Sequence, residues 1–84
     1  MIMSFKTVGT EDIFHGKDTK AARKLDQLDS VESLAELRVP PGNRIEALIG
    51  ARKGQYNIRI NEKYRICFSW TKKGPRDVEI VDYH

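Results

Sequence analysis

The sequence predicts an α+β fold in which N-terminal helices pack on one face of a small antiparallel β-sheet. Apolar residues in the first half recur at spacings of three and four, which is the period of an amphipathic helix. In the second half they alternate with polar residues, as in a strand with one buried face. Because the links between these strands are short, we expect neighbouring strands to run antiparallel. The helices are the only cover available for the apolar face of the sheet.

The first elements follow from local signals near the N-terminus. A short strand is expected over Ile2–Lys6. Thr10 is a hydroxyl residue followed by two acids, so a short helix is expected to begin there and to end near Gly16. A second helix is expected to begin at Asp18 or Thr19. One face of this helix is apolar and consists of Ala21, Ala22, Leu25 and Leu28.

The remaining elements are a brief third helix and the strands. Asp29 and Glu32 resemble a capping pair for the third helix, and the segment Pro40–Asn43 is a turn that links the helical half to the sheet. Clear alternation predicts three strands, over residues 55–61, 64–70 and 77–82. A further strand is expected over residues 44–49. The glycine-containing segment 50–54 that follows separates it from the next strand.

Length and composition limit the classes of protein that need to be considered. The chain has 84 residues, of which 39% are hydrophobic and 32% charged, so we expect one folded domain over residues 1–84. Cys67 is the only cysteine, which excludes an internal disulfide, and no metal-type spacing of Cys and His surrounds it. The sequence shows neither a secretion signal nor an apolar run long enough for a membrane span. We therefore expect a cytoplasmic protein without a membrane partner.

Positive charge is concentrated in the second half of the chain. Residues 38–84 hold ten basic and five acidic residues, whereas residues 1–37 carry a net charge of −2. This distribution predicts that an anionic partner, such as a nucleic acid, meets the second half. The alternative is a solvated basic surface without a ligand.

One face of the predicted sheet is suited to binding phosphate. By alternation it carries Arg59, Arg65, Glu79 and Tyr83. Guanidinium groups donate hydrogen bonds in a fixed fork, and a tyrosine can hydrogen-bond to a nucleotide or stack on its base. The alternative is that the two arginines solvate this face and pair with Glu79.

Several strings resemble the HigB-type toxins of the RelE/ParE superfamily. They are Pro40–Leu48, Gly54–Asn61, Tyr64–Phe68 and the ending Val78–His84. The order of an Ile-Arg-Ile-Asn strand, a Tyr-Arg-Ile strand and a terminal Asp-Tyr-His carries the resemblance. It implies a RelE-like fold and a toxin of a type II toxin-antitoxin system that cleaves mRNA in the ribosomal A site, without a metal or another cofactor.

The resemblance also implies a catalytic site. In such enzymes the ribose 2′-OH attacks the adjacent phosphate, so the site needs a base, an acid and positive charge. Arg65 matches the arginine that stabilises the transition state, and Tyr83 and His84 match the terminal acid-base pair, whose two roles stay unassigned. Asp82 is expected to orient His84 or to pair with an arginine. Strict alternation places Asp82 and His84 on the helix-covered face unless the strand ends or bulges near Asp82.

The sequence departs from the family at two positions near this site. Ile49 stands where family members commonly have lysine, and Glu46 stands where some have histidine. Arg52 and Lys53 are candidates to replace the missing charge, and lower activity is the alternative. Together with Arg44 and Arg59 they form the set of residues that we expect to bind RNA.

The resemblance finally implies partners. They are a HigA-like antitoxin with a helix-turn-helix domain, mRNA and the ribosome, while operator DNA is bound only through the antitoxin complex. One alternative is a ParE-like poison of DNA gyrase, against which the terminal Tyr83-His84 pair argues. Another is a nucleic-acid-binding module without catalysis.

Overall fold

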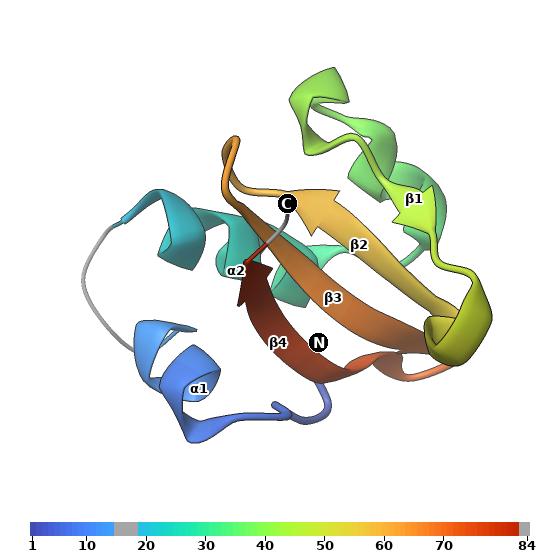
Figure 1. Ribbon diagram of the computed structural model, residues 1–84, viewed down its shortest axis with the longest axis horizontal. Helices are drawn as coiled ribbons and strands as arrows, with labels where there is room; N and C mark the ends of the chain where they lie inside the picture. The colour runs from blue at the N-terminus through green and yellow to red at the C-terminus, as the bar shows by residue number, and fades with distance from the viewer. Residues whose placement is uncertain (15–18, 83–84) are drawn as a thin grey trace.

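The computed structural model describes residues 1–14 and 19–82 (Figure 1). The helices within this part are α1 (Val8–Phe14), α2 (Lys20–Ser30) and the short 3-10 helices η1 (Leu34–Arg38), η2 (Pro41–Asn43) and η3 (Gly50–Arg52). The strands are β1 (Glu46–Ala47), β2 (Gln55–Arg59), β3 (Tyr64–Thr71) and β4 (Gly74–Asp82). They form one antiparallel sheet in the order β1-β2-β3-β4, which confirms the predicted α+β meander.

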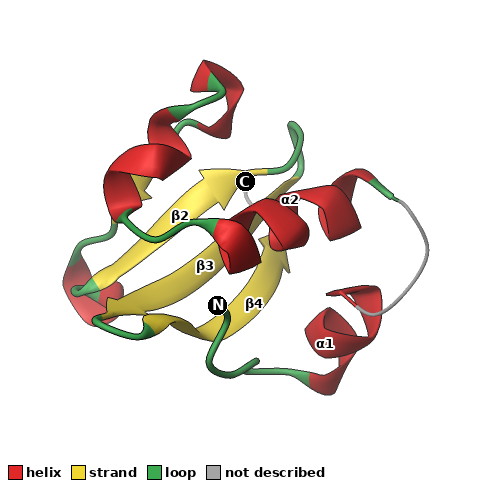
Figure 2. Ribbon diagram, turned by 180° about the vertical axis from the view of Figure 1, so that it is seen from behind, coloured by secondary structure: helices red, strands yellow, loops and turns green. Residues whose placement is uncertain are grey.

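Helix α2 covers one face of the sheet (Figure 2). Its side chains Ala22, Leu25 and Leu28 are buried, as the periodicity predicts, and the helix begins after Thr19, whose hydroxyl accepts from the backbone N–H of Ala22 at 3.1 Å. The core beneath it combines apolar residues of α2 with those that alternate inward along the strands, including Ile58, Ile66, Phe68 and Val78. Burial of each such side chain, relative to its exposure to water, stabilises the fold by about 1.5–3 kcal/mol.

Helix α1 differs from the sequence prediction. It begins at Val8, and Thr7 provides the cap, because the Thr7 hydroxyl accepts from the backbone N–H of Thr10 at 3.2 Å. Thr10, expected at the cap, is instead buried inside the helix, where its hydroxyl accepts from the backbone N–H of Ile80 in β4 at 3.1 Å. This contact holds α1 beside the β4 edge rather than over the sheet face (Figure 1). The expected end near Gly16 lies outside the described residues.

The prediction of a strand over Ile2–Lys6 is also wrong. This segment runs beside β4 but forms only a parallel bridge between Phe5 and Val78. Three backbone hydrogen bonds hold it there, from Met3 N to Pro75 O, from Val78 N to Ser4 O and from Lys6 N to Val78 O. The outer edge of β4 is therefore occupied by the start of the chain.

The third helix is the 3-10 helix η1, and its predicted cap is wrong. The Glu36 carboxylate accepts from the backbone N–H of Ser33 at 3.0 Å, so Ser33 and Glu36 mark the start of the helix. Asp29 instead accepts from the backbone N–H of Ile2 at 2.8 Å and fixes the N-terminal segment. A tertiary contact therefore engages the carboxylate that the sequence pattern assigned to a helix cap.

The strands differ from the predicted bounds, β2 by ending at Arg59 and β3 by ending at Thr71, and the other two more substantially. The strand expected over residues 44–49 shortens to Glu46–Ala47, because Arg44 adopts a left-handed conformation with φ of 45°. The strand expected from Asp77 begins earlier, at Gly74, and contains a register shift at Asp77, whose φ is 52°. The turn between β2 and β3 is closed by the Asn61 side chain, which accepts from the backbone N–H groups of Lys63 and Tyr64, each at 2.8 Å.

Candidate active site

The face of the sheet opposite α2, which we call the polar face, carries the residues that alternation predicts. Arg59 in β2 pairs with Arg65 in β3. Cys67 in β3 pairs with Asn57 on one side and with Glu79 in β4 on the other. Arg59, Arg65 and Glu79 therefore share this face, as predicted. Tyr83, expected to follow them, lies outside the described residues, as does His84.

Arg65 is the most buried basic group of the polar face. Its residue is 6% exposed, and its Nη2 donates to the Arg44 carbonyl oxygen at 2.6 Å and lies 3.1 Å from the Glu46 carboxylate. Glu46 reaches Arg65 across β2, because Glu46 in β1 pairs with Asn57. A guanidinium held by two acceptors in a water-poor site has little freedom left to reorient.

A pocket of about 210 Å³ brings three arginines together at the end of β2 and the start of β3. Its lining consists of Arg44, Arg59, Asn61, Glu62 and Arg65. Arg59 Nε donates to the Asn61 carbonyl oxygen at 3.2 Å, and neither Arg44 nor Arg59 forms an ion pair with the residues that the structure describes. We call this hollow the arginine pocket.

The alternative in which the predicted arginines pair with Glu79 is wrong. The Glu79 carboxylate lies 3.0 Å from Arg52 and 3.6 Å from Lys6. Arg65 has Glu46 as its acidic partner, so neither Arg59 nor Arg65 pairs with Glu79. Two of the predicted arginines, Arg44 and Arg59, therefore reach the pocket without a carboxylate partner in the described part of the chain.

Arg52 and Lys53, predicted to bind RNA, lie outside the arginine pocket. Arg52 is bound on two sides, to Glu79 and to the Gln55 side chain at 3.2 Å. Lys53 is exposed, as is Ile49, which is 88% exposed at the position where the family commonly has lysine. These residues flank the polar face on the β1–β2 side of the sheet.

Asp82 ends β4 at the same end of the sheet as the arginine pocket. It lies opposite Tyr64, while its neighbour Val81 lies opposite Arg65. The register is continuous from Glu79 to Asp82, so no bulge turns Asp82 toward the polar face. The structure thus brings the end of β4 close to Arg65 but places Asp82 on the other face, as strict alternation predicts.

Cys67 lies on the polar face and is 3% exposed. Burial raises the pKa of its thiol, an effect that the positive charge of Arg52 partly opposes. A buried thiol with a raised pKa is a poor nucleophile. Within residues 1–14 and 19–82, no cluster of three His, Cys, Asp or Glu side chains is arranged to hold a metal ion.

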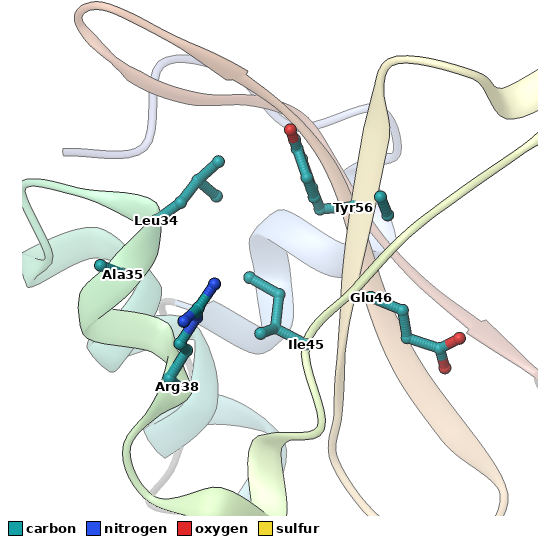
Figure 3. Close-up of a pocket in the computed structure, with 7 residues that line it drawn as sticks. Leu34, Ala35, Arg38, Ile45, Glu46 and Tyr56 are labelled. Atoms are coloured by element: carbon teal, nitrogen blue, oxygen red, sulfur yellow. The ribbon is translucent and has the colours of Figure 1, made fainter.

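Glu46 is a residue of the site to which the sequence pattern assigned no role, and the structure shows that it pairs with Arg65. A second pocket, of about 350 Å³, lies between η1 and β1–β2, where Leu34, Ile45 and Tyr56 form an apolar wall (Figure 3). The Glu46 side chain points away from that wall (Figure 3), and its carboxylate contacts Arg65 on the polar face. The signal that identifies its role is the β1–β2 register, which a two-residue strand does not reveal from sequence alone.

Comparisons with known proteins agree on the kind of protein that this chain resembles. Residues 5–84 match the model of a HigB-like toxin family, described as the RelE-like toxin HigB of type II toxin-antitoxin systems. Toxin HigB-1 of Vibrio cholerae is 50% identical over 48 residues, which are 57% of this chain and 50% of that toxin. An uncharacterised protein of Haemophilus influenzae is 39% identical over 49 residues, which are 58% of this chain and 48% of that protein. The match thus spans about half the length of these curated relatives.

Two solved structures share the fold. The YoeB–YefM complex of Staphylococcus aureus contains a chain with a TM-score of 0.65 and 21% identity, over 100% of this chain and 95% of that one. The YoeB/ParE toxin of Agrobacterium tumefaciens has a TM-score of 0.57 and 18% identity, over 99% and 96% of the two chains. Within the described residues, no helix has both the length and the apolar character that a bilayer span requires.

Proposed function

Because the chain belongs to the HigB-like family of RelE-like toxins of type II toxin-antitoxin systems, we propose that it is an endoribonuclease that cleaves mRNA on the ribosome. The observation that carries the proposal is the arginine pocket, in which Arg44, Arg59 and Arg65 converge. A cluster of guanidinium groups at one hollow is suited to a phosphodiester. The Arg65 guanidinium is held in one position by Glu46 and by the Arg44 carbonyl oxygen. Such a fixed position favours catalysis, which depends on the orientation of the charged group, over non-specific binding.

The proposed reaction is an attack of the ribose 2′-OH on the adjacent phosphorus. The bond from O2′ to phosphorus forms, the bond from phosphorus to O5′ breaks, and the proton lost by O2′ is balanced by one delivered to O5′. Arg65 stabilises the additional negative charge of the transition state, while Arg44 and Arg59 hold the phosphate. Tyr83 and His84 are proposed as the groups that move the two protons, and Asp82 as the residue that orients His84. The course of β4 supports a contribution from the end of this strand, because Val81 lies opposite Arg65. Asp82 itself lies on the other face of the sheet, so its proposed role requires His84 to be reached from that face.

Arg52 and Lys53 are proposed to contact RNA at the flank of the polar face. Lys53 is exposed and has no acidic partner among the described residues, whereas Arg52 must leave Glu79 to reach a phosphate. If they replace the family lysine missing at Ile49, replacing both by Gln lowers cleavage. Unchanged cleavage in that variant contradicts the compensation.

A toxin of this class needs a partner that neutralises it. We propose a HigA-like antitoxin with a helix-turn-helix domain, through which alone the complex contacts operator DNA and represses its operon. One of the structures that share the fold is a toxin–antitoxin complex, the YoeB–YefM pair. The cytoplasm, where mRNA and ribosomes meet, is the proposed location.

The proposal is tested by mapping mRNA 5′ ends by primer extension, with and without translating ribosomes. We expect codon-phased cuts that depend on ribosomes and that are absent in Arg65→Ala and His84→Ala. Arg76→Ala is the matched control, because Arg76 is exposed and its ion pair within the described residues is with its neighbour Asp77. Arg65→Lys, which keeps the charge but not the fork, separates lost chemistry from lost folding.

Two other outcomes identify the alternative functions. Intact mRNA together with broken chromosomal DNA indicates a gyrase poison. RNA binding with a steep salt dependence and no strand scission indicates a binding module without catalysis. Cleavage that continues in Arg65→Ala contradicts the assignment of the site.

A further inference from the structure

A second basic pocket lies directly beside the arginine pocket. It has a volume of about 400 Å³ and lies between α2 and the end of β2. Its lining consists of Lys20, Lys24, Gly42, Arg59, Ile60, Asn61 and Glu62. Three of these residues, Arg59, Asn61 and Glu62, also line the arginine pocket, so the two hollows share a wall. We call the second one the lysine pocket.

The lysine pocket gathers positive charge that is not neutralised. Lys20, Lys24 and Arg59 contribute three cations against the single carboxylate of Glu62. None of the three forms an ion pair with any residue in 1–14 or 19–82. Clustered charges of one sign in a hollow raise the local concentration of counter-ions, so this one-sided lining favours binding of an anion.

One of these lysines is held in place by a buried amide. Lys24 Nζ donates to the side-chain oxygen of Asn43, a residue that is fully buried. The Asn43 amide nitrogen in turn donates to the Leu37 carbonyl oxygen at 3.1 Å and to the Gln27 side chain at 3.2 Å. Burial and the neighbouring charge of Lys20 lower the pKa of Lys24, so the two ammonium groups repel each other within one site.

We infer that the lysine pocket binds a second backbone phosphate of the RNA strand, adjacent to the phosphate held in the arginine pocket. The inference rests on the proposed function, since the substrate strand is what connects the two pockets. Arg59 borders both hollows and bridges the two phosphates, while Lys20 and Lys24 approach the second phosphate from α2. The candidate RNA path thus extends from the polar face around the end of the sheet onto the helix.

The test measures binding of a fluorescent single-stranded octanucleotide by anisotropy at several salt concentrations. The RNA carries 2′-O-methyl groups, so it has no 2′-OH with which to be cleaved. In the variant Lys20→Gln/Lys24→Gln we expect about five-fold weaker binding at low salt. The slope of log K against log salt is expected to fall by about 0.7, the value for one lost phosphate contact on a single strand.

Two controls separate this effect from a general loss of charge or of folding. Lys72→Gln/Lys73→Gln removes the same charge from the exposed β3–β4 turn, at the other end of the sheet, and should bind as the wild type does. Lys20→Gln alone keeps the bond between Lys24 and Asn43 and should lose part of the affinity. A dinucleotide offers a single phosphate, which we expect the arginine pocket to hold, so its affinity should not change in the Lys20→Gln/Lys24→Gln variant.

The results that overturn the inference differ from those that overturn the nuclease. Wild-type affinity in the Lys20→Gln/Lys24→Gln variant, or an equal loss in the Lys72→Gln/Lys73→Gln control, shows that the lysine pocket holds no phosphate. The inference is also overturned if the Lys20→Gln/Lys24→Gln variant binds RNA as the wild type does but binds an acidic antitoxin segment more weakly. That result assigns the lysine pocket to a protein partner. Loss of octanucleotide affinity in a protein that never cleaves mRNA supports the lysine pocket and contradicts the nuclease proposal.

Discussion

Replacing Glu46 by Gln tests how the candidate active site is held. The Arg65 side chain is 7% exposed and the Glu46 side chain 47% exposed, with Nη2 and Oε1 3.1 Å apart. Removing one partner of a fully buried ion pair costs about 3–5 kcal/mol, whereas an exposed pair contributes about 0.2–1 kcal/mol. This pair has one end in each environment, so we expect Glu46→Gln to lower the free energy of unfolding by about 1–2 kcal/mol.

The assay is thermal unfolding followed by circular dichroism. For a domain of this size, such a loss corresponds to a fall in Tm of about 5–15 °C. Glu62→Gln is the matched control, because Glu62 is exposed, lines the arginine pocket and forms no ion pair with the described residues. Its Tm should stay within about 2 °C of the wild type, as for a surface substitution that breaks no contact.

A double-mutant cycle with Arg65→Met isolates the pair itself. We expect a coupling energy of about 1 kcal/mol or more between Glu46 and Arg65, because contacting residues are not additive. Equal Tm values for Glu46→Gln and Glu62→Gln, or a coupling energy near zero, would refute the view that Glu46 fixes the guanidinium. The arginine pocket would then have to be organised by the Arg44 carbonyl contact.

Three further changes test other parts of the structure. Asn43→Ala should cost about 2–3 kcal/mol in urea unfolding, because it leaves the buried Leu37 carbonyl without its donor. Thr19→Ala should cost about 1 kcal/mol by loss of the α2 cap, measured by the same unfolding curve, whereas Thr19→Ser should cost little. Cys67 should react with a thiol reagent at pH 8 far more slowly in the native protein than in guanidinium, because burial hides the thiol and raises its pKa. Equal rates in the two states, or unfolding curves that do not move, contradict these assignments.

The elements that could be predicted from sequence are those with a long, uninterrupted period. Helix α2 and strands β2 and β3 satisfy this condition, and Leu25, Ile58 and Ile66 are buried as expected. Burial on the polar face was not predicted, since Asn57, Arg65 and Cys67 are buried there as well. The failures are at elements whose limits depend on a tertiary partner. The Ile2–Lys6 segment lies beside β4 without becoming a strand, and Thr10 is drawn into the helix by its contact with Ile80.

The same distinction applies to the candidate active site. Alternation alone placed Arg59 and Arg65 on one face, because a strand period of two needs no knowledge of the neighbouring strands. The role of Glu46 depends on the pairing of β1 with β2. Arg59 forms no ion pair with Glu79, because the Glu79 carboxylate pairs with Arg52 and Lys6 instead. Partner choice among several acids and bases is a tertiary property, so the sequence left it open.

The N-terminal segment beside β4 also bears on how molecules of this protein meet one another. An uncovered strand edge offers unpaired N–H and C=O groups on which a second chain can build. Here the chain's own Met3, Ser4 and Lys6 occupy that edge, and the opposite edge is a strand of only two residues. Neither margin offers a long template for sheet extension, which disfavours edge-to-edge aggregation when many copies are present.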